Sequence, residues 1–172
     1  MSGDSESQKQ LYLQYGPMIK GICLRYAANE EEGEDLFHDT FLFILVNFKS
    51  YNKITSLGAW LRRITINKAI DHYRQRSRQK TASIEDIPVE PSVDSTPLNE
   101  ILTMEQLVTF INELPDKYRT AFNLYIIDGM EQEEIVKVMN ETSTNVRTLV
   151  FRARNILQKK IQRYLNHEEF KI

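Results

Sequence analysis

Apolar residues recur at helical spacing along most of the chain, in groups separated by short polar segments. In the first group, tyrosines and isoleucines between residues 12 and 26 follow one another at steps of three or four. The same spacing predicts further helices at 30–48, 57–80, 104–111, 115–125, 131–139 and 143–165. β-branched residues are scattered and do not alternate with polar ones, so no strand is predicted. The pattern therefore predicts an all-α fold.

One segment breaks this pattern and divides the chain. Residues 81–100 hold three of the five prolines, five acidic residues and no lysine or arginine. Such a composition favours an extended, solvated segment over a helix. We therefore expect two small helical domains, at 8–80 and 98–167, joined by a flexible acidic linker at 81–97.

Composition limits the class of protein. The chain has 172 residues, a net charge of −2 and one cysteine, so no internal disulfide can form. A lone cysteine fits a reducing compartment, and the polar N-terminus does not resemble a signal peptide. The longest apolar run, FLFILV at 41–46, is too short to cross a bilayer. We expect a cytoplasmic protein with no membrane insertion.

The helix predicted at 57–80 carries one polar face. Successive steps of +4, +4, +3 and +4 place five polar residues on that face: Arg63, Asn67, Asp71, Arg74 and Arg78. Between residues 61 and 80 there are seven basic residues and one acid, Asp71, which we expect to align Arg74 or Asn67. Apolar residues on two other sides can hold the helix in its domain. The pattern indicates a DNA phosphate-binding face, and the alternative is a helix whose charges only keep the protein in solution.

A second basic segment, 131–165, has the pattern of a helix-turn-helix. Asn140 stands at the predicted turn, and Thr142 or Ser143 can cap the next helix. That helix has an apolar seam at Val146, Val150, Ala153 and Leu157. Its first residues would lie nearest the bases of a major groove. The candidates for base contact are Thr144, Asn145, Arg147 and Thr148, and those for phosphate contact or packing are Arg152 and Arg154. A helical hairpin without a DNA role is the alternative.

The segment 30–39 has six acidic residues and no basic one. It suits docking to a positively charged protein better than DNA binding. Glu34 and His38 have the spacing of a metal-binding pair, but no second histidine or cysteine lies nearby. The sequence contains no nucleophile–base arrangement and no glycine-rich phosphate loop. It therefore predicts no enzyme, no cofactor, no metal site and no small-molecule substrate.

Four segments, taken in order, resemble the signatures of extracytoplasmic-function sigma factors of bacterial RNA polymerase. The segments are EDLFHDTFLFIL, AWLRRITINKAIDHYRQRSR, LPDKYRTAFNLYIIDGMEQEEI and NVRTLVFRARNIL. The sequence departs from the family pattern at four positions: His38, Asn140, Glu141 and Leu149. The match covers about 8–165, nearly the whole chain.

The resemblance implies a role for each domain. The first would dock the polymerase through Asp35, Leu36, His38, Asp39 and Phe41. It would read and open the minus-ten promoter element with the polar stripe and the 49–57 loop, and Trp60 would be a stacking wedge or a core residue. The 143–154 helix would read the minus-thirty-five element. The linker would thread toward the polymerase active-site channel, and an anti-sigma factor would cover both DNA-binding faces.

We therefore predict a sigma factor, whose partners are core RNA polymerase, promoter DNA and an anti-sigma factor. Two alternatives remain. A stand-alone helix-turn-helix repressor or activator would bind its operator as a dimer without polymerase, and a helical interaction protein would not contact DNA. The near-neutral net charge and the separate acidic helix favour the sigma factor.

Overall fold

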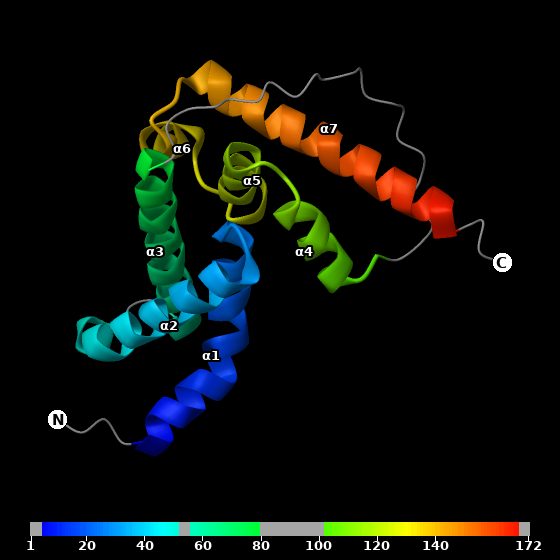
Figure 1. Cartoon of the computed structure of the whole chain (residues 1–172). Helices are drawn as coiled ribbons and strands as arrows, with labels where there is room; N and C mark the ends of the chain where they lie inside the picture. The colour runs from blue at the N-terminus through cyan, green and yellow to red at the C-terminus, as the bar shows by residue number, and fades with distance from the viewer. Residues whose placement is uncertain (1–4, 52–55, 80–101, 169–172) are drawn as a thin grey trace. The chain divides into compact units, whose positions relative to one another are not determined.

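The computed structural model describes residues 5–51, 56–79 and 102–168, and all the regular structure in these ranges is helical (Figure 1). The helices are α1 Ser5–Tyr26, α2 Glu30–Asn47, the short 3-10 helix η1 Phe48–Ser50, α3 Leu57–Gln79, α4 Met104–Asn112, α5 Asp116–Phe122, the π-helical η2 Asn123–Ile127, α6 Gln132–Met139 and α7 Ser143–Glu168. The predicted all-α fold is confirmed for this part of the chain. The chain divides into two compact units between Gln79 and Lys80. The predicted linker at 81–97 lies outside the described residues.

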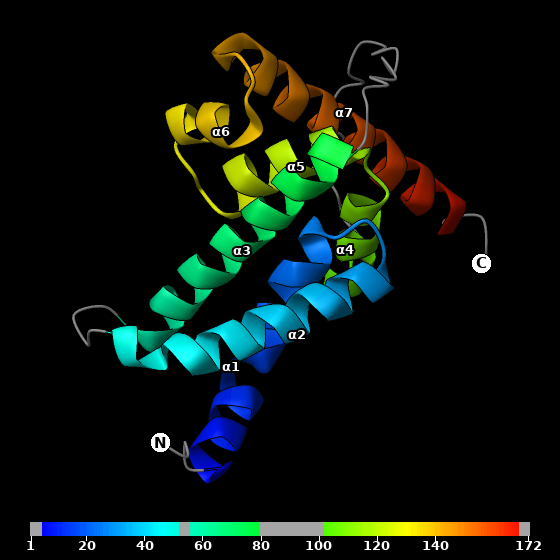
Figure 2. The same ribbon diagram turned by 60° about the vertical axis from the view of Figure 1, so that its left-hand side comes forward.

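The first unit is a packed bundle of α1, α2 and α3 (Figure 2). The apolar residues with the predicted spacing supply its buried core, which includes Ile19, Ile22, Cys23, Tyr26, Phe37, Ile44, Leu61, Ala69, Ile70 and Tyr73. Helices α1 and α2 approach closely at Gly33, where an added Cβ would lie 2.6 Å from Cδ2 of Leu24 and 3.2 Å from its Cα. A larger residue at this position would therefore push the two helices apart.

The start of α2 is fixed by its own side chains. Asn29 is the N-cap residue, and its side chain accepts a hydrogen bond of 2.8 Å from the backbone N–H of Glu32. The carboxylate of Glu32 in turn accepts one from the backbone N–H of Ala28. This reciprocal pair resembles a capping box, which satisfies backbone donors that the helix itself leaves unpaired. The prediction that a helix begins in the acidic run is confirmed.

In the second unit, α5, α6 and α4 pack against α7. Pro115 is the N-cap of α5, and the buried Arg119 joins α5 to the end of α4. Its guanidinium donates to the backbone carbonyl of Asn112 at 2.9 Å and to Asp116 at 3.0 Å. The π-helical turn η2, which follows α5, was not predicted. It is followed by a turn at Asp128–Gly129, where Gly129 takes a φ of 65°.

The predicted helix-turn-helix is confirmed as a fold. Asn140 ends α6 in the left-handed conformation, with φ 53° and ψ 47°, which asparagine tolerates better than most residues. Thr142 caps α7, because its hydroxyl accepts a hydrogen bond of 3.1 Å from the N–H of Asn145. The predicted seam of α7 is buried throughout, at Val146, Val150, Ala153 and Leu157.

Candidate nucleic-acid interface

The polar stripe of α3 lies open to solvent. Arg63, Asn67, Asp71 and Arg78 are exposed, and Arg74 is half-buried. The opposite sides of the helix hold the buried residues Leu61, Ile66, Ala69, Ile70 and Tyr73. Asp71 Oδ1 lies 3.9 Å from Arg74 Nη1, so Arg74 is the one of its two expected partners that Asp71 contacts. At that length and exposure the ion pair aligns Arg74 without burying its charge.

Two basic residues of the same segment contact side chains of α2. Arg76 has a side chain only 10% exposed, and its Nη1 lies 2.8 Å from Glu32 Oε1. Its Nη2 donates to the backbone carbonyl of Tyr26 at 3.2 Å. Lys68 Nζ lies 3.9 Å from the centre of the Phe43 ring, within cation–π range. The predicted basic face therefore consists mainly of the stripe residues, because part of the segment's charge serves the fold.

Glu32 is the acceptor that holds Arg76. His72 Nε2 lies 3.3 Å from the same carboxylate oxygen. Partial burial raises the pKa of Glu32. The hydrogen bonds from Arg76 and from the N–H of Ala28, together with the charge of Arg76, lower it by more than burial raises it, so the net pKa is below its ordinary value. Glu32 is thus one acid of the predicted docking segment that is engaged within its own unit.

Trp60 belongs to a cluster of three aromatic rings at the ends of the 49–57 loop. Its ring centre lies 5.3 Å from that of Tyr51 and 6.0 Å from that of Phe48. Trp60 is half-buried, so it packs within the unit and keeps an accessible surface. Residues 52–55 of the loop lie outside the described part of the chain, so the expected role of this loop in reading and opening the minus-ten element stays a prediction.

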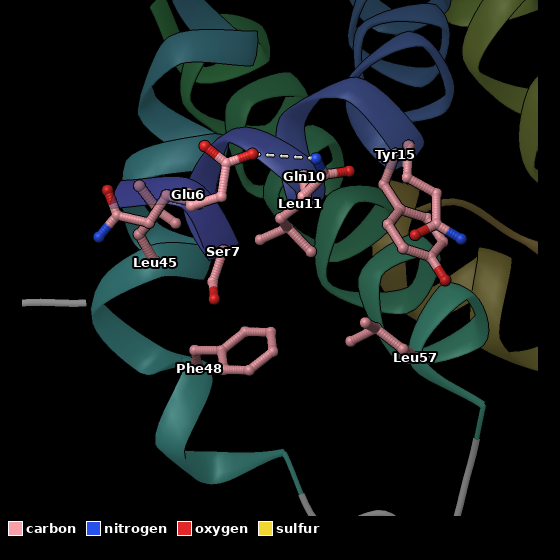
Figure 3. Close-up of a pocket in the computed structure, with 10 residues that line it drawn as sticks. Glu6, Ser7, Gln10, Leu11, Tyr15, Leu45, Phe48 and Leu57 are labelled. Carbon is pink, nitrogen blue, oxygen red and sulfur yellow. Dashed lines mark hydrogen bonds between the residues drawn. The ribbon is translucent and has the colours of Figure 1, made fainter. Parts of the chain in front are cut away.

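A hollow of about 420 Å³ lies beside this cluster (Figure 3). Its apolar wall comes from four elements of the first unit, α1, α2, η1 and α3, and consists of Leu11, Tyr15, Leu45, Phe48 and Leu57. Polar residues from the first turns of α1 form the rim, where Gln10 donates to Glu6 at 3.1 Å. The hollow leaves one side of Phe48 exposed to solvent.

The outer face of α2 carries three of the predicted docking residues, Asp35, His38 and Asp39, which are exposed. The predicted docking role of Leu36 has to be corrected. Its side chain is only 6% exposed and lies in the core, so it offers no surface to a partner. Phe41 is half-buried, with its ring centre 5.4 Å from that of Tyr12.

Sequence reasoning missed two residues of this α2 face. Leu42 and Val46 are 61% and 79% exposed, although they belong to an apolar run that reads as core. They follow His38 at steps of four, which places them on the same face as the acids.

Glu34, which has the spacing of a metal-binding pair with His38, forms an ion pair with Lys20. In the described ranges no three histidine, cysteine, aspartate or glutamate residues are grouped to hold a metal ion.

Helix α7 presents Thr144, Arg147 and Arg154 to solvent, and these are three of the residues that the sequence proposes as candidates for DNA contact. Between the two arginines lies Phe151, which is 56% exposed and was not predicted. Arg147, Phe151 and Arg154 follow one another at steps of four and three, a spacing that could have revealed this face. A hollow of about 240 Å³ beside them is lined by Tyr125, Gln132, Val146, Arg147, Val150, Phe151 and Arg154.

The other predicted residues of α7 are engaged within the unit. Arg152 is half-buried and donates to the hydroxyl of Tyr118 at 3.4 Å, which favours packing over phosphate contact. The hydroxyl of Thr148 donates to the carbonyl of Thr144 at 3.0 Å. Leu149 is buried, which explains the absence of a basic residue at that position.

Asn145 contacts a charged neighbour. Its Nδ2 donates to Glu141 Oε2 at 2.6 Å, and the other oxygen of Glu141 lies 2.8 Å from Lys117 Nζ. Burial raises the pKa of Glu141, but Lys117 and Asn145 lower it by more than burial raises it. The net pKa is therefore below the ordinary value. Glu141, where the sequence departs from the family pattern, is therefore an anchor between α5 and α7.

Comparison with known proteins explains why these two units occur in one chain. Residues 11–79 match Sigma-70 region 2, and residues 104–157 match Sigma-70 region 4. The chain belongs to the sigma-70 family. It is 27% identical to the ECF RNA polymerase sigma factor SigM of Bacillus subtilis, over 92% of this chain and 98% of that protein. It is 28% identical to SigW of the same organism, over 93% and 91%.

A solved sigma factor has the same fold. The structure of RpoE in complex with the anti-sigma factor NepR from Bartonella quintana matches with a TM-score of 0.51 and 23% identity, over 90% of this chain and 96% of that one. The predicted resemblance to extracytoplasmic-function sigma factors is confirmed. Sigma factors are regulatory proteins rather than catalysts. In the residues that the structure describes, no helix combines the length and apolar character that a membrane span needs.

Proposed function

We propose that this sigma factor binds core RNA polymerase through the exposed face of α2 and selects promoters through α3 and α7. The observation that carries the proposal is the pair of separate exposed faces on the first unit. One is the polar stripe of α3, and the other is the row of acids and apolar residues on α2. A stand-alone repressor needs only a DNA-binding face and a surface for its own dimer.

The α2 face has the composition of a protein-docking surface. Leu42 and Val46 provide exposed apolar area, and Asp35 and Asp39 provide negative charge beside it. Interfaces commonly combine an apolar centre with a polar rim, and complementary charge speeds and orients association. The partner is therefore a surface of core polymerase with apolar residues flanked by basic ones.

The α3 stripe supplies the contacts to the minus-ten element. Arg63, Asn67 and Arg78 are exposed, and Asp71 aligns Arg74 among them. Arginine and asparagine side chains bind phosphates and base edges. The accessible part of Trp60 can stack on a base at the opened junction, since aromatic rings stack on unpaired bases.

The α7 face supplies the contacts to the minus-thirty-five element. Thr144 and Arg147 lie at the start of the helix, which enters the major groove first in a helix-turn-helix. Phe151 can contact a thymine methyl group, and Arg154 can reach a phosphate. Asn145, Thr148 and Arg152 act mainly by holding the helix in place, since each makes a contact within the unit.

The remaining elements of the proposal follow from the family. The domains are 8–80 and 98–167, and the acidic linker at 81–97 would enter the polymerase channel. The solved relative RpoE is bound to an anti-sigma factor, and we infer a regulator of this kind for the present chain. The protein would act in the cytoplasm, where core polymerase and DNA are found.

Binding experiments separate this function from its alternatives. The purified chain should co-elute with core polymerase, and it should bind promoter DNA weakly alone and specifically in the complex. Val46→Asp should weaken co-elution. Tight operator binding by the free chain as a dimer, without co-elution with polymerase, would contradict the proposal and indicate a stand-alone regulator.

A further inference from the structure

We propose that Gln132 is a positioning residue that orients Arg147 to read a guanine in the upstream promoter element. This inference rests on the proposed function, and it adds a specificity-determining residue outside the recognition helix. Gln132 is the first residue of α6, and Arg147 lies in the second turn of α7. The two side chains meet across the turn of the helix-turn-helix.

The contacts fix the orientation of the Gln132 amide. Its Nε2 donates to the backbone carbonyl of Ser143 at 3.1 Å and to the hydroxyl of the same residue. Its Oε1 accepts from Arg147 Nε at 3.2 Å. A carbonyl can only accept and an arginine Nε can only donate. The reversed amide would therefore lose its hydrogen bonds to the Ser143 carbonyl and to Arg147 Nε. Both amide hydrogens are used on Ser143, which makes Gln132 a support for Arg147 rather than a DNA contact itself.

The hydrogen bond determines what Arg147 can offer. With Nε engaged by Gln132, the two terminal nitrogens Nη1 and Nη2 remain, and they have no partner among the described residues. These two donors form a planar fork at the end of an exposed side chain. A fork of this kind matches the O6 and N7 acceptors of guanine, the commonest base-specific contact in the major groove.

The neighbours of Arg147 leave the fork as the principal base reader. On the other side of the helix, the Asn145 amide is held by Glu141, which pairs with Lys117. Thr144, in the first turn, has a short side chain and one hydroxyl. A phosphate would also accept the fork. A phosphate contact and a guanine contact can be told apart by mutating Arg147. Loss of a phosphate contact weakens binding to all sequences alike, whereas loss of a base contact changes the preference at one position.

The test is transcription by reconstituted holoenzyme on a promoter pool that is randomised in the upstream element, with sequencing of the templates that initiate. The variants are Gln132→Ala, Gln132→Glu, which keeps an acceptor for Arg147, and Arg147→Lys, which keeps the charge and loses the fork. Gln158→Ala is the matched control, since it is an exposed glutamine about 16 Å further along α7. Thermal unfolding of each variant checks that the second unit is folded.

The wild type should select guanine at one position. Arg147→Lys should reduce that selection about tenfold or more, and Gln132→Ala should reduce it about three- to tenfold with the other positions unchanged. Gln132→Glu should retain more of the selection than the alanine variant, and Gln158→Ala should retain all of it. Unchanged base selection by folded Gln132→Ala, or a uniform loss by Arg147→Lys, would overturn the inference while leaving the sigma-factor function intact. Failure of the wild type to initiate would overturn both.

Discussion

Arg76 and Glu32 form an ion pair that joins the end of α3 to the first turn of α2. Arg76 Nη1 lies 2.8 Å from Glu32 Oε1, and the same guanidinium also holds the carbonyl of Tyr26 at the end of α1. The ion pair therefore ties three helices at one point. It fixes the part of α3 that carries Arg74 and Arg78, and it explains why one arginine of this basic segment is engaged within the unit.

Removing this ion pair should destabilise the first unit. Arg76→Met leaves Glu32 partly buried without its main partner, and we expect a loss of about 1–3 kcal/mol in the free energy of unfolding. Trp60, the only tryptophan of the chain, lies in the first unit, so urea unfolding followed by its fluorescence reports on that unit. Glu31→Gln, which removes an exposed acid one residue away from Glu32, is the matched control. Equal unfolding midpoints for Arg76→Met and Glu31→Gln would contradict the structural role.

The same ion pair should appear in the pH dependence of stability. The pKa of Glu32 in the folded state is below its ordinary value of 4.5, so the unfolded chain takes up this proton first as the pH falls. The contribution of Glu32 is therefore fully present above pH 4.5 and is lost as the pH falls through the folded pKa. Carboxylates titrate between roughly pH 6 and pH 3. Over this range, urea unfolding of Glu32→Gln should show a shallower loss of stability with falling pH than that of the wild type. Identical slopes for the two proteins would refute this assignment.

The stripe of α3 should determine promoter opening without affecting polymerase binding. Arg63→Ala combined with Arg74→Ala removes two cations of the stripe, and the dependence of holoenzyme binding on salt should weaken by about two phosphate equivalents. Opening of the minus-ten region, measured by permanganate reactivity of unpaired thymines, should fall in parallel. Lys9→Ala, which removes an exposed cation on α1, should leave both unchanged. Normal opening by the double variant would instead favour a helical interaction protein.

Leucines six positions apart on α2 should respond in opposite ways. Leu36→Ala should destabilise the first unit by about 2–5 kcal/mol because the side chain is buried. Leu42→Ala should change stability by less than about 0.5 kcal/mol because its side chain is exposed, and it should weaken the affinity for core polymerase. Fluorescence titration of labelled variants with core polymerase measures this affinity, with Leu13→Ala on α1 as an exposed-leucine control. If Leu42→Ala binds as tightly as Leu13→Ala, the docking face lies elsewhere.

Cys23 should be protected in the folded protein. The thiol is buried, and burial raises its pKa to about 12 although the neighbouring side chain of Thr40 on α2 opposes the shift. The thiolate is the species that thiol reagents attack. At about pH 8, close to the ordinary pKa of a thiol, we expect alkylation of Cys23 by iodoacetamide to be slow in the native protein and fast in urea. Rapid alkylation of the native chain would contradict this burial.

The sequence was sufficient to predict the helical fold and the positions of α3 and α7, because helical periodicity sets which side chains share a face. It gave the stripe from Arg63 to Arg78 and the turn at Asn140, and the exposure of the stripe and the conformation of that turn agree with it. Periodicity describes one helix at a time, however. It could not show that Arg76 meets Glu32 from another helix, or that Gln132 supports Arg147, since both depend on how helices distant in sequence approach.

Motif resemblance had a different weakness at α2. It carried Leu36 into the docking set because the family signature includes that position, whereas the structure buries the side chain. It left out Leu42 and Val46, since an apolar run reads as core until the buried faces of a helix are known. The π-helical turn at Asn123–Ile127 had no signal in the sequence, because apolar spacing does not separate a single π-helical turn from the α-helix that it continues.

Reconstituted transcription tests the central claim most directly. Core polymerase should be supplied with the purified chain and a library of genomic fragments, and the 5′ ends of the transcripts should be sequenced. We predict that addition of the chain creates a discrete set of starts that share two upstream elements, and that Arg63→Ala with Arg74→Ala abolishes them. Starts that do not depend on the added chain would contradict the assignment of this protein as a promoter-selecting sigma factor.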